Sequence, residues 1–290
     1  MAAARRGKRS RISGYGLGGA DNVLSVDAVA AAADELARSG PDLGQLDALL
    51  RGAPLVAIDG LVAGYGKMEV LHGFDLRVAA GQSLCLIGPN GAGKSTVLHS
   101  IYGLTRITAG SIKVGGRNVT RVAASRKLRT AGVAYILQDN SVFPDMTVEE
   151  NLLLGGFLKD RPAQAREAAD RIFDKYASLA ARRRQRAGVL SGGERRLLEI
   201  SRALIMNPSV LLVDEPSIGL EPRFIDMVFD ILHELQHGEG KTIIIVEQNA
   251  KKGLEFADIG YVLVSGRLAL AGTGAETLAN PEVGRLFLGG

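Results

Sequence analysis

Short apolar runs and longer runs with helical periodicity alternate along the chain from residue 55 onward. Continuous apolar runs, which are typical of strands buried on both faces of a parallel sheet, occur at 83–88, 209–215 and 242–248. Shorter runs bounded by glycine-containing turns, which predict further strands and hairpins, occupy 55–66, 70–82, 110–119, 132–137 and 261–272.

Helices are expected between these strands, at about 94–103, 147–157, 162–180, after Ser191, and from near Pro222 to Gly238. This alternation predicts an α/β fold with a mainly parallel sheet that is covered on both faces. The hairpins predict an antiparallel β subdomain. Residues 146–204 are almost wholly helical in pattern and are expected to form a separate lobe.

Residues 1–54 differ in composition from the rest of the chain. The segment is rich in Arg and free of acids as far as Ala20, and an Ala-rich helix is expected at 25–40, with Ser25 as its N-cap. We expect 1–54 to be a largely disordered extension and 55–290 to be the folded domain. A transit peptide, or a start site placed too early, are the alternatives.

The charge distribution argues against a nucleic-acid-binding surface. The 290 residues carry a formal net charge of +4, but five positive charges without an acid lie at Arg5, Arg6, Lys8, Arg9 and Arg11. The rest of the chain therefore carries about −1. No apolar run is long enough to cross a membrane. Cys85 is the one cysteine, lies in an apolar run and is expected to fill the core.

A glycine-rich loop, GPNGAGKST, follows the apolar run at 83–88 and opens a predicted helix. It fits the pattern G-x-x-x-x-G-K-[ST] in the strand–loop–helix context that identifies a P-loop. Its backbone N–H groups would close around the phosphates, Lys94 would reach the β and γ oxygens, and Ser95 would bind Mg²⁺. The predicted nucleotide-binding residues of this loop are Gly88, Pro89, Asn90, Gly91, Ala92, Gly93, Lys94, Ser95 and Thr96.

Two adjacent carboxylates end the apolar run at 209–215. The strand would deliver Asp214 to the edge of the sheet where ligands bind, to hold Mg²⁺, and Glu215 would polarise an attacking water. Gln138, after the strand at 132–137, could contact Mg²⁺ or that water. Tyr65 is placed to stack on adenine, and an ordinary turn tyrosine is the alternative.

A second candidate anion-binding motif, LSGGE, lies at residues 190–194. Ser191, Gly192 and Gly193 open a predicted amphipathic helix, where a hydroxyl, backbone N–H groups and the helix dipole favour an anion. One chain of this size therefore carries two candidate phosphate-binding motifs, the P-loop and LSGGE.

The P-loop, Gln138, LSGGE, VDEP and SIGLEP occur in the order found in ATP-binding-cassette ATPases, which the region 55–290 resembles. The resemblance implies ATP and Mg²⁺ as cofactors and a pair of subunits, a heterodimer or a homodimer. In such a pair Ser191, Gly192 and Gly193 close over ATP held by the facing subunit. It also implies ATP hydrolysis with Glu215, Gln248 and Lys94 as catalytic residues, and Mg²⁺ held at Ser95, Gln138 and Asp214.

The segments FPDMTVEENLLLGGF, RRRQRAGVLSGGE, VEQNA and LFLGG resemble the second ATP-binding protein of branched-chain amino acid importers. Urea and amide importers, and the lipopolysaccharide exporter, are the related alternatives. This resemblance implies two membrane permeases and an external binding protein as partners, at the cytoplasmic face of the membrane. The stretch from Gln138 to Thr147 would meet the permease. A soluble cassette protein acting on ribosomes or DNA is the rival interpretation.

Two positions depart from the family pattern. Glu221 stands where an aspartate is usual, and Gln248 stands where the switch histidine is usual. Two further motifs are discounted. HELQH at 233–237 matches a zinc-protease pattern without a third ligand, and ARRRQR at 181–186 is expected to be a solvated face, with a subunit contact as the alternative.

Overall fold

The computed structural model describes residues 40–138 and 141–287, which form two sheets. The larger sheet has six strands in the order β10-β9-β3-β8-β7-β6 and the smaller has four in the order β2-β1-β4-β5. All neighbours in the larger sheet run parallel except β10, which is antiparallel to β9. The strand bounds are β1 Pro54–Tyr65, β2 Met68–Ala79, β3 Ser83–Ile87, β4 Arg106–Val114, β5 Arg117–Asn118, β6 Val133–Ile136, β7 Val210–Asp214, β8 Thr242–Val246, β9 Ile259–Val264 and β10 Arg267–Thr273.

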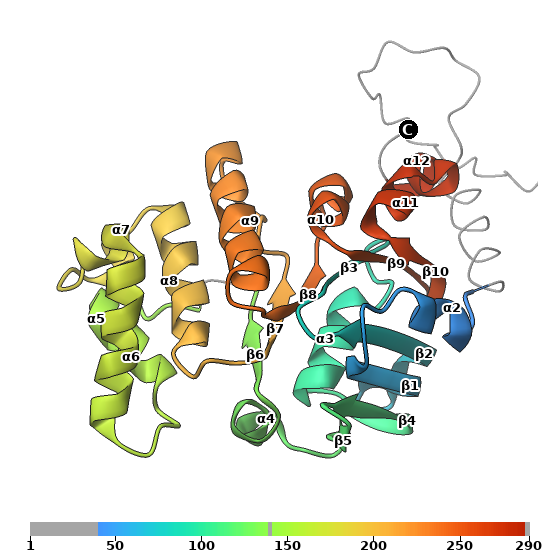
Figure 1. The fold of residues 1–290 in the computed structure, drawn as a ribbon, viewed down its shortest axis with the longest axis horizontal. Helices are drawn as coiled ribbons and strands as arrows, with labels where there is room; N and C mark the ends of the chain where they lie inside the picture. The colour runs from blue at the N-terminus through green and yellow to red at the C-terminus, as the bar shows by residue number, and fades with distance from the viewer. Residues whose placement is uncertain (1–39, 139–140, 288–290) are drawn as a thin grey trace, which may run out of the picture.

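Helix α3 lies between the two sheets and contacts strands of both. On the other face of the larger sheet, α10 packs on β3, α9 on β8 and α11 on β9 (Figure 1). The helix bounds are α2 Leu43–Ala48, α3 Lys94–Tyr102, α4 Ala124–Ala131, α5 Val148–Gly155, α6 Pro162–Lys175, α7 Ala177–Ala180, α8 Gly192–Leu204, α9 Pro222–His237, α10 Ala250–Phe256, α11 Gly274–Ala279 and α12 Pro281–Phe287.

The continuous apolar runs are explained by two cores, one on each face of the larger sheet. Along β3, Cys85 and Ile87 join one core, whereas Leu84 and Leu86 join the other. Successive side chains of a strand point to opposite faces, so a strand covered on both faces must be apolar at every position. Cys85 is fully buried and fills the core, as the sequence predicts.

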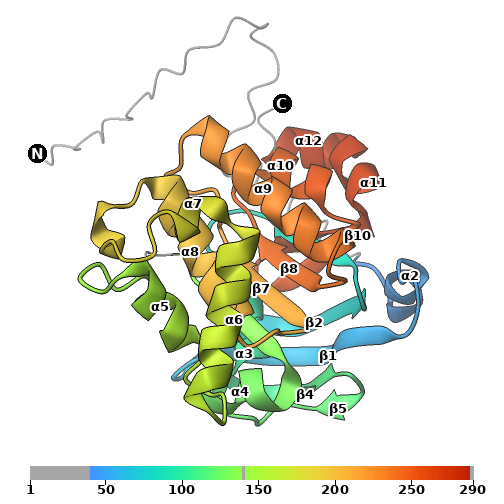
Figure 2. The same ribbon diagram turned by 60° about the vertical axis from the view of Figure 1, so that its left-hand side comes forward.

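Helices α5 to α8 form the lobe expected at 146–204. Figures 1 and 2 both place them together on one side of the molecule, and α2 lies on the opposite side. Helix α8 joins the lobe to the rest, because it contacts β6 and α9. The single helix expected at 162–180 is divided at Tyr176, whose φ of −120° and ψ of 89° interrupt it.

The extension expected at 1–54 overlaps the described residues only from Gly40. The helix expected at 25–40 lies outside the described residues except for Gly40. Between Gly40 and Ala53 the chain is folded: α2 starts with a capping box formed by Asp42 and Gln45. Leu46 is fully buried in the core beside the smaller sheet, and this burial holds α2 against the domain. Across the described ranges, no helix is long and apolar enough to span a bilayer.

Candidate nucleotide site

The P-loop connects β3 to α3 through glycines that no other residue could replace without strain. Gly88 has a φ of +144°, and a Cβ there would lie 2.1 Å from the carbonyl oxygen of Leu263. Gly93 has a φ of +101° and is the N-cap of α3. These left-handed conformations turn the backbone around an open loop. This cradle of backbone groups at a helix N-terminus fits a phosphate chain.

Lys94 is buried at the start of α3 and lies across the loop. Its Nζ donates to the carbonyl oxygens of Gly88 at 2.9 Å and Pro89 at 3.0 Å. Burial lowers the pKa of Lys94, and the charges of Glu215 and Asp214 oppose this shift. The loop thus holds a partly desolvated cation, which fits binding of an anionic group such as a triphosphate.

Asp214 ends β7 and meets the P-loop helix. Its Oδ1 accepts a hydrogen bond from Ser95 Oγ at 3.0 Å, and its Oδ2 accepts one from Tyr135 Oη at 2.7 Å. Ser95 and Asp214 provide a hydroxyl and a carboxylate side by side, and oxygen ligands of this kind suit Mg²⁺. The predicted metal residues Ser95 and Asp214 are therefore brought together, and Tyr135 is a neighbour that sequence reasoning missed.

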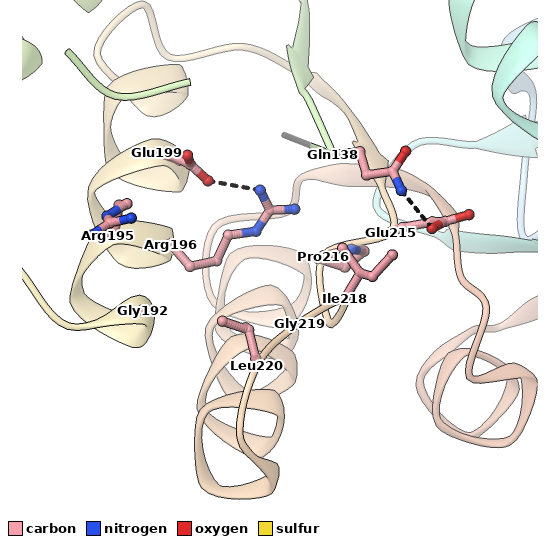
Figure 3. Close-up of a pocket in the computed structure, with 10 residues that line it drawn as sticks. All are labelled: Gln138, Gly192, Arg195, Arg196, Glu199, Glu215, Pro216, Ile218, Gly219 and Leu220. Atoms are coloured by element: carbon pink, nitrogen blue, oxygen red, sulfur yellow. Dashed lines mark hydrogen bonds and ion pairs between the residues drawn. The ribbon is translucent and has the colours of Figure 1, made fainter. Parts of the chain in front are cut away.

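Glu215 is held in an unusual conformation at the end of β7. Its φ is +42°, and its backbone N–H donates to the carbonyl oxygen of Val246 at 2.8 Å. Gln138 Nε2 donates to Glu215 Oε2 at 2.9 Å, so these two predicted residues face one another (Figure 3). Burial raises the pKa of Glu215, the neighbouring charge of Asp214 adds to this shift, and Lys94 opposes it.

A cleft of about 300 Å³ opens beside Glu215 and Gln138. Helix α8 forms its other wall with Gly192, Arg195 and Arg196, as Figure 3 shows. Arg196 is buried, donates to Glu199 Oε2 at 2.8 Å and to the carbonyl oxygen of Leu137 at 2.9 Å, and so ties α8 to the end of β6.

The second anion-binding motif, LSGGE, forms a complete helix cap at the start of α8. Ser191 Oγ accepts a hydrogen bond from Glu194 N at 3.3 Å, and Glu194 Oε2 accepts one from Ser191 N at 2.9 Å. Ser191 and Gly192 are exposed, whereas Gly193 is buried against Phe224. Ser191 uses its hydroxyl as an acceptor within the cap, so the hydroxyl hydrogen is free to donate to an anion.

The remaining predicted residues lie at the edges of the site. Tyr65 ends β1, is 39% exposed and is hydrogen-bonded through Oη to Nδ1 of His99, a residue of α3 that sequence reasoning missed. His99 follows Ser95 by four positions on one helix face, which is a signal that could have found it. Gln248 is exposed after β8. Glu221 is the N-cap of α9, with its Oε2 3.1 Å from Arg223 Nε.

Glu247 is a second residue that sequence reasoning missed. It is 2% exposed, and its Oε1 accepts hydrogen bonds from Ser217 Oγ at 2.7 Å and Asn249 N at 2.9 Å. The carboxylate therefore connects the loop after Glu215 to the loop that carries Gln248. A charged residue within an apolar run, directly before Gln248, was the available signal.

The two discounted motifs have ordinary contacts. The His233 and His237 rings lie 4.8 Å apart between centroids, and within the part of the chain described here no group of three or more potential His, Cys, Asp or Glu ligands could hold a metal. In the arginine run, Arg182 pairs with Glu194 at 2.6 Å and Arg183 pairs with Glu149 at 2.6 Å. These two arginines join parts of the helical lobe, rather than forming only a solvated face.

These features define a P-loop ATPase: the glycine-rich loop, the buried Lys94, and the hydrogen bond from Ser95 to Asp214 at the end of β7. A family model described as "ABC transporter" matches residues 71–218, and the chain belongs to this family of ATPases. The branched-chain amino acid transport ATP-binding protein BraG of Pseudomonas aeruginosa is 40% identical over 236 residues, which cover 81% of this chain and all of that protein.

Other relatives and solved structures agree with this family. The lipopolysaccharide export ATP-binding protein LptB of Haemophilus influenzae is 31% identical and is matched over 81% of this chain and 97% of its own length. A solved ATP-binding cassette of an ABC transporter, in its ADP conformation, superposes with a TM-score of 0.72 at 27% identity, over 82% of this chain and all of that one. The α/β fold with an antiparallel subdomain and a helical lobe is thereby confirmed.

Proposed function

We propose that this ATPase drives an importer of branched-chain amino acids. The observation that carries its chemistry is the contact between Ser95 and Asp214, which joins the P-loop to the strand that bears Glu215. The substrate class is supported by the 40% identity to BraG and by the 36% identity to a LivF protein of Archaeoglobus fulgidus over 229 residues. The relationship to LptB makes lipopolysaccharide export the second candidate.

Each residue of the site has a role in this proposal. The P-loop and Lys94 bind the phosphates of ATP, Tyr65 stacks on adenine, and Ser95, Asp214 and Gln138 hold Mg²⁺, directly or through water. Bound Mg²⁺ supplies charge neutralisation on the phosphate oxygens. Glu215 orients water and accepts its proton, and its partly buried position beside Gln138 supports this role. Gln248 contributes positioning alone, because an amide cannot accept a proton at neutral pH.

The anion-binding motif at Ser191 binds ATP that is held by a facing subunit. The facing subunit is a second ATP-binding protein or a second copy of this chain. The exposure of Ser191 and Gly192 at a capped helix supports this assignment. ATP then joins two subunits, and its hydrolysis releases them. Ser191→Arg would therefore leave ATP binding by the isolated chain unchanged but prevent hydrolysis in the assembled pair. Loss of ATP binding by the isolated variant would contradict the assignment.

The permease partners are supported by an apolar groove between α4, β6, α5 and α8. The groove has a volume of about 720 Å³, and the side chains of Phe143, Phe157 and Leu137 on its walls are 50%, 84% and 43% exposed. Large exposed apolar side chains around one groove are typical of a surface that a partner covers. Leu137 directly precedes Gln138, so a permease loop seated here would lie near the site. In this proposal the chain works at the cytoplasmic face of a membrane, bound to the permeases.

The test is transport by the complete system. We expect proteoliposomes that contain this chain, a second ATP-binding subunit and two permeases to take up radiolabelled leucine when ATP and the binding protein are present. Lys94→Ala should abolish uptake, whereas His237→Ala, on the far end of α9, should not. ATP hydrolysis without leucine uptake, but with uptake of urea or release of lipopolysaccharide, would assign the chain to one of the related transporters.

A further inference from the structure

A row of side chains on α3 faces the nucleotide-binding edge of the sheet. Ser95, His99 and Tyr102 recur at intervals of four and three residues, which places them on one face of the helix. Ser95 contacts Asp214, and the rings of His99 and Tyr102 contact the ring of Tyr135, with centroids 5.7 Å and 5.5 Å apart. This face of α3 therefore packs on β6, through Tyr135, and on the end of β7, through Asp214.

His99 also reaches out of this row toward the antiparallel sheet. Its Nδ1 is hydrogen-bonded to Tyr65 Oη, and the two rings meet edge to face with centroids 6.0 Å apart and planes at 83°. On its other side, His99 meets the ring of Tyr135 at 77°. Since Tyr135 Oη donates to Asp214 Oδ2 at 2.7 Å, one chain of contacts connects Tyr65 to the carboxylate of the metal site.

Tyr65 needs such a support if it is to bind a base. It stands at the last position of β1 and is 39% exposed, so its side chain would otherwise rotate in solvent. Ordering a free side chain on binding reduces affinity, and fixing it beforehand avoids this loss. A hydrogen bond to the phenol oxygen holds the ring by its edge, so that a face stays available for stacking.

We propose that His99 is a positioning residue for nucleotide binding, which fixes the Tyr65 ring for the base and joins it through Tyr135 to Asp214. The inference rests on the proposed function of Tyr65 as the base-stacking residue. Its ligand class is a nucleotide with an aromatic base, and it predicts that His99 affects binding of the base and not binding of the phosphates.

The experiment compares ADP with inorganic pyrophosphate, which lacks the base and binds the P-loop alone. Dissociation constants are measured on the full-length chain by calorimetry and by displacement, and neither ligand is consumed. We expect His99→Leu to raise the dissociation constant for ADP about 3- to 10-fold, the range that follows from ordering one side chain. The constant for pyrophosphate should change by less than about twofold. His237→Leu is the matched control and should change neither.

Three further variants separate positioning from a general disturbance of α3. Tyr65→Phe keeps the ring but loses the hydrogen bond, so it should weaken ADP binding as His99→Leu does. The double variant should be no weaker than either single variant, because both remove one contact. His99→Asn should restore part of the affinity, since its amide oxygen can take the place of Nδ1.

An equal loss of pyrophosphate binding in His99→Leu, or additive losses in the double variant, would overturn the inference. The proposed role of Tyr65 is tested separately by Tyr65→Ala. If this variant binds ADP like the wild type, the stacking role and the role of His99 both fail. If Tyr65→Ala weakens ADP binding but His99→Leu does not, the stacking role stands and the inference about His99 is wrong.

Discussion

Replacing Glu215 by glutamine separates the chemical step from ATP binding. The substitution preserves the size of the side chain and an oxygen that can accept the hydrogen bond from Gln138 Nε2, now 2.9 Å long. The backbone N–H still donates to Val246, and glutamine tolerates the φ of +42° about as well as glutamate does. The free energy of unfolding should therefore change by less than about 1 kcal/mol.

The rate of hydrolysis should fall far more than stability does. Removing a general base typically lowers a rate by about 10² to 10⁴-fold, or about 3 to 5 kcal/mol in the activation free energy. The Glu215→Gln chain should bind ATP, remain in the closed pair and hydrolyse very slowly. Tyr65→Ala should weaken ATP binding and lower the rate at saturating ATP much less.

The assay is steady-state ATP hydrolysis by the assembled transporter in liposomes, with the dissociation constant for ATP and the urea unfolding curve of the isolated chain measured alongside. A near wild-type rate for Glu215→Gln would refute the assignment of Glu215 as the base. A lost rate together with lost ATP binding or a lowered unfolding midpoint would refute the structural part of the reasoning, because it would show that Glu215 holds the site together.

Three other predictions concern Gln248, the buried Lys127 of α4 and the arginine run beside the cap of α8. If the facing subunit carries the switch histidine, Gln248→Ala should lower transporter-coupled hydrolysis less than alanine at that histidine does. Gln248→His should stay active. An equal or larger loss for Gln248→Ala would rule out unequal sites. Burial lowers the pKa of Lys127 to about 8, so the folded protein loses this proton before the unfolded chain does. Between about pH 8 and the ordinary lysine value of 10.5, the wild type should gain stability relative to Lys127→Met in urea unfolding, and a constant difference would contradict the burial argument. Arg182→Met removes the ion pair to Glu194 in the helix cap and should lower hydrolysis by the assembled pair, with a loss of about 0.5 kcal/mol or less in stability. Arg184→Met, an exposed neighbour, is the control, and an equal effect of the two would show that only the charge of the run matters.

The sequence alone determined the order of the elements and the chemistry of the loops. A strand buried on both faces must be apolar throughout, so β3, β7 and β8 stand out as continuous runs. The P-loop and the cap at Ser191 are local, because their geometry depends on glycines, a helix start and residues a few positions apart. Such features can be read from spacing.

Tertiary structure decided which of these pieces meet. Gln138 and Glu215, 77 positions apart, face one another because β6 and β7 are adjacent and parallel, so that their carboxyl ends share one edge. Nothing in the sequence specified that Tyr135 would bind Asp214, a contact that depends on the pairing of β6 with β7. Nor did it specify that His99 would hold Tyr65, which depends on where α3 lies between the sheets. The folding of α2 also depended on a distant partner: a six-residue helix is too short to be stable alone, and the burial of Leu46 against the domain stabilises it.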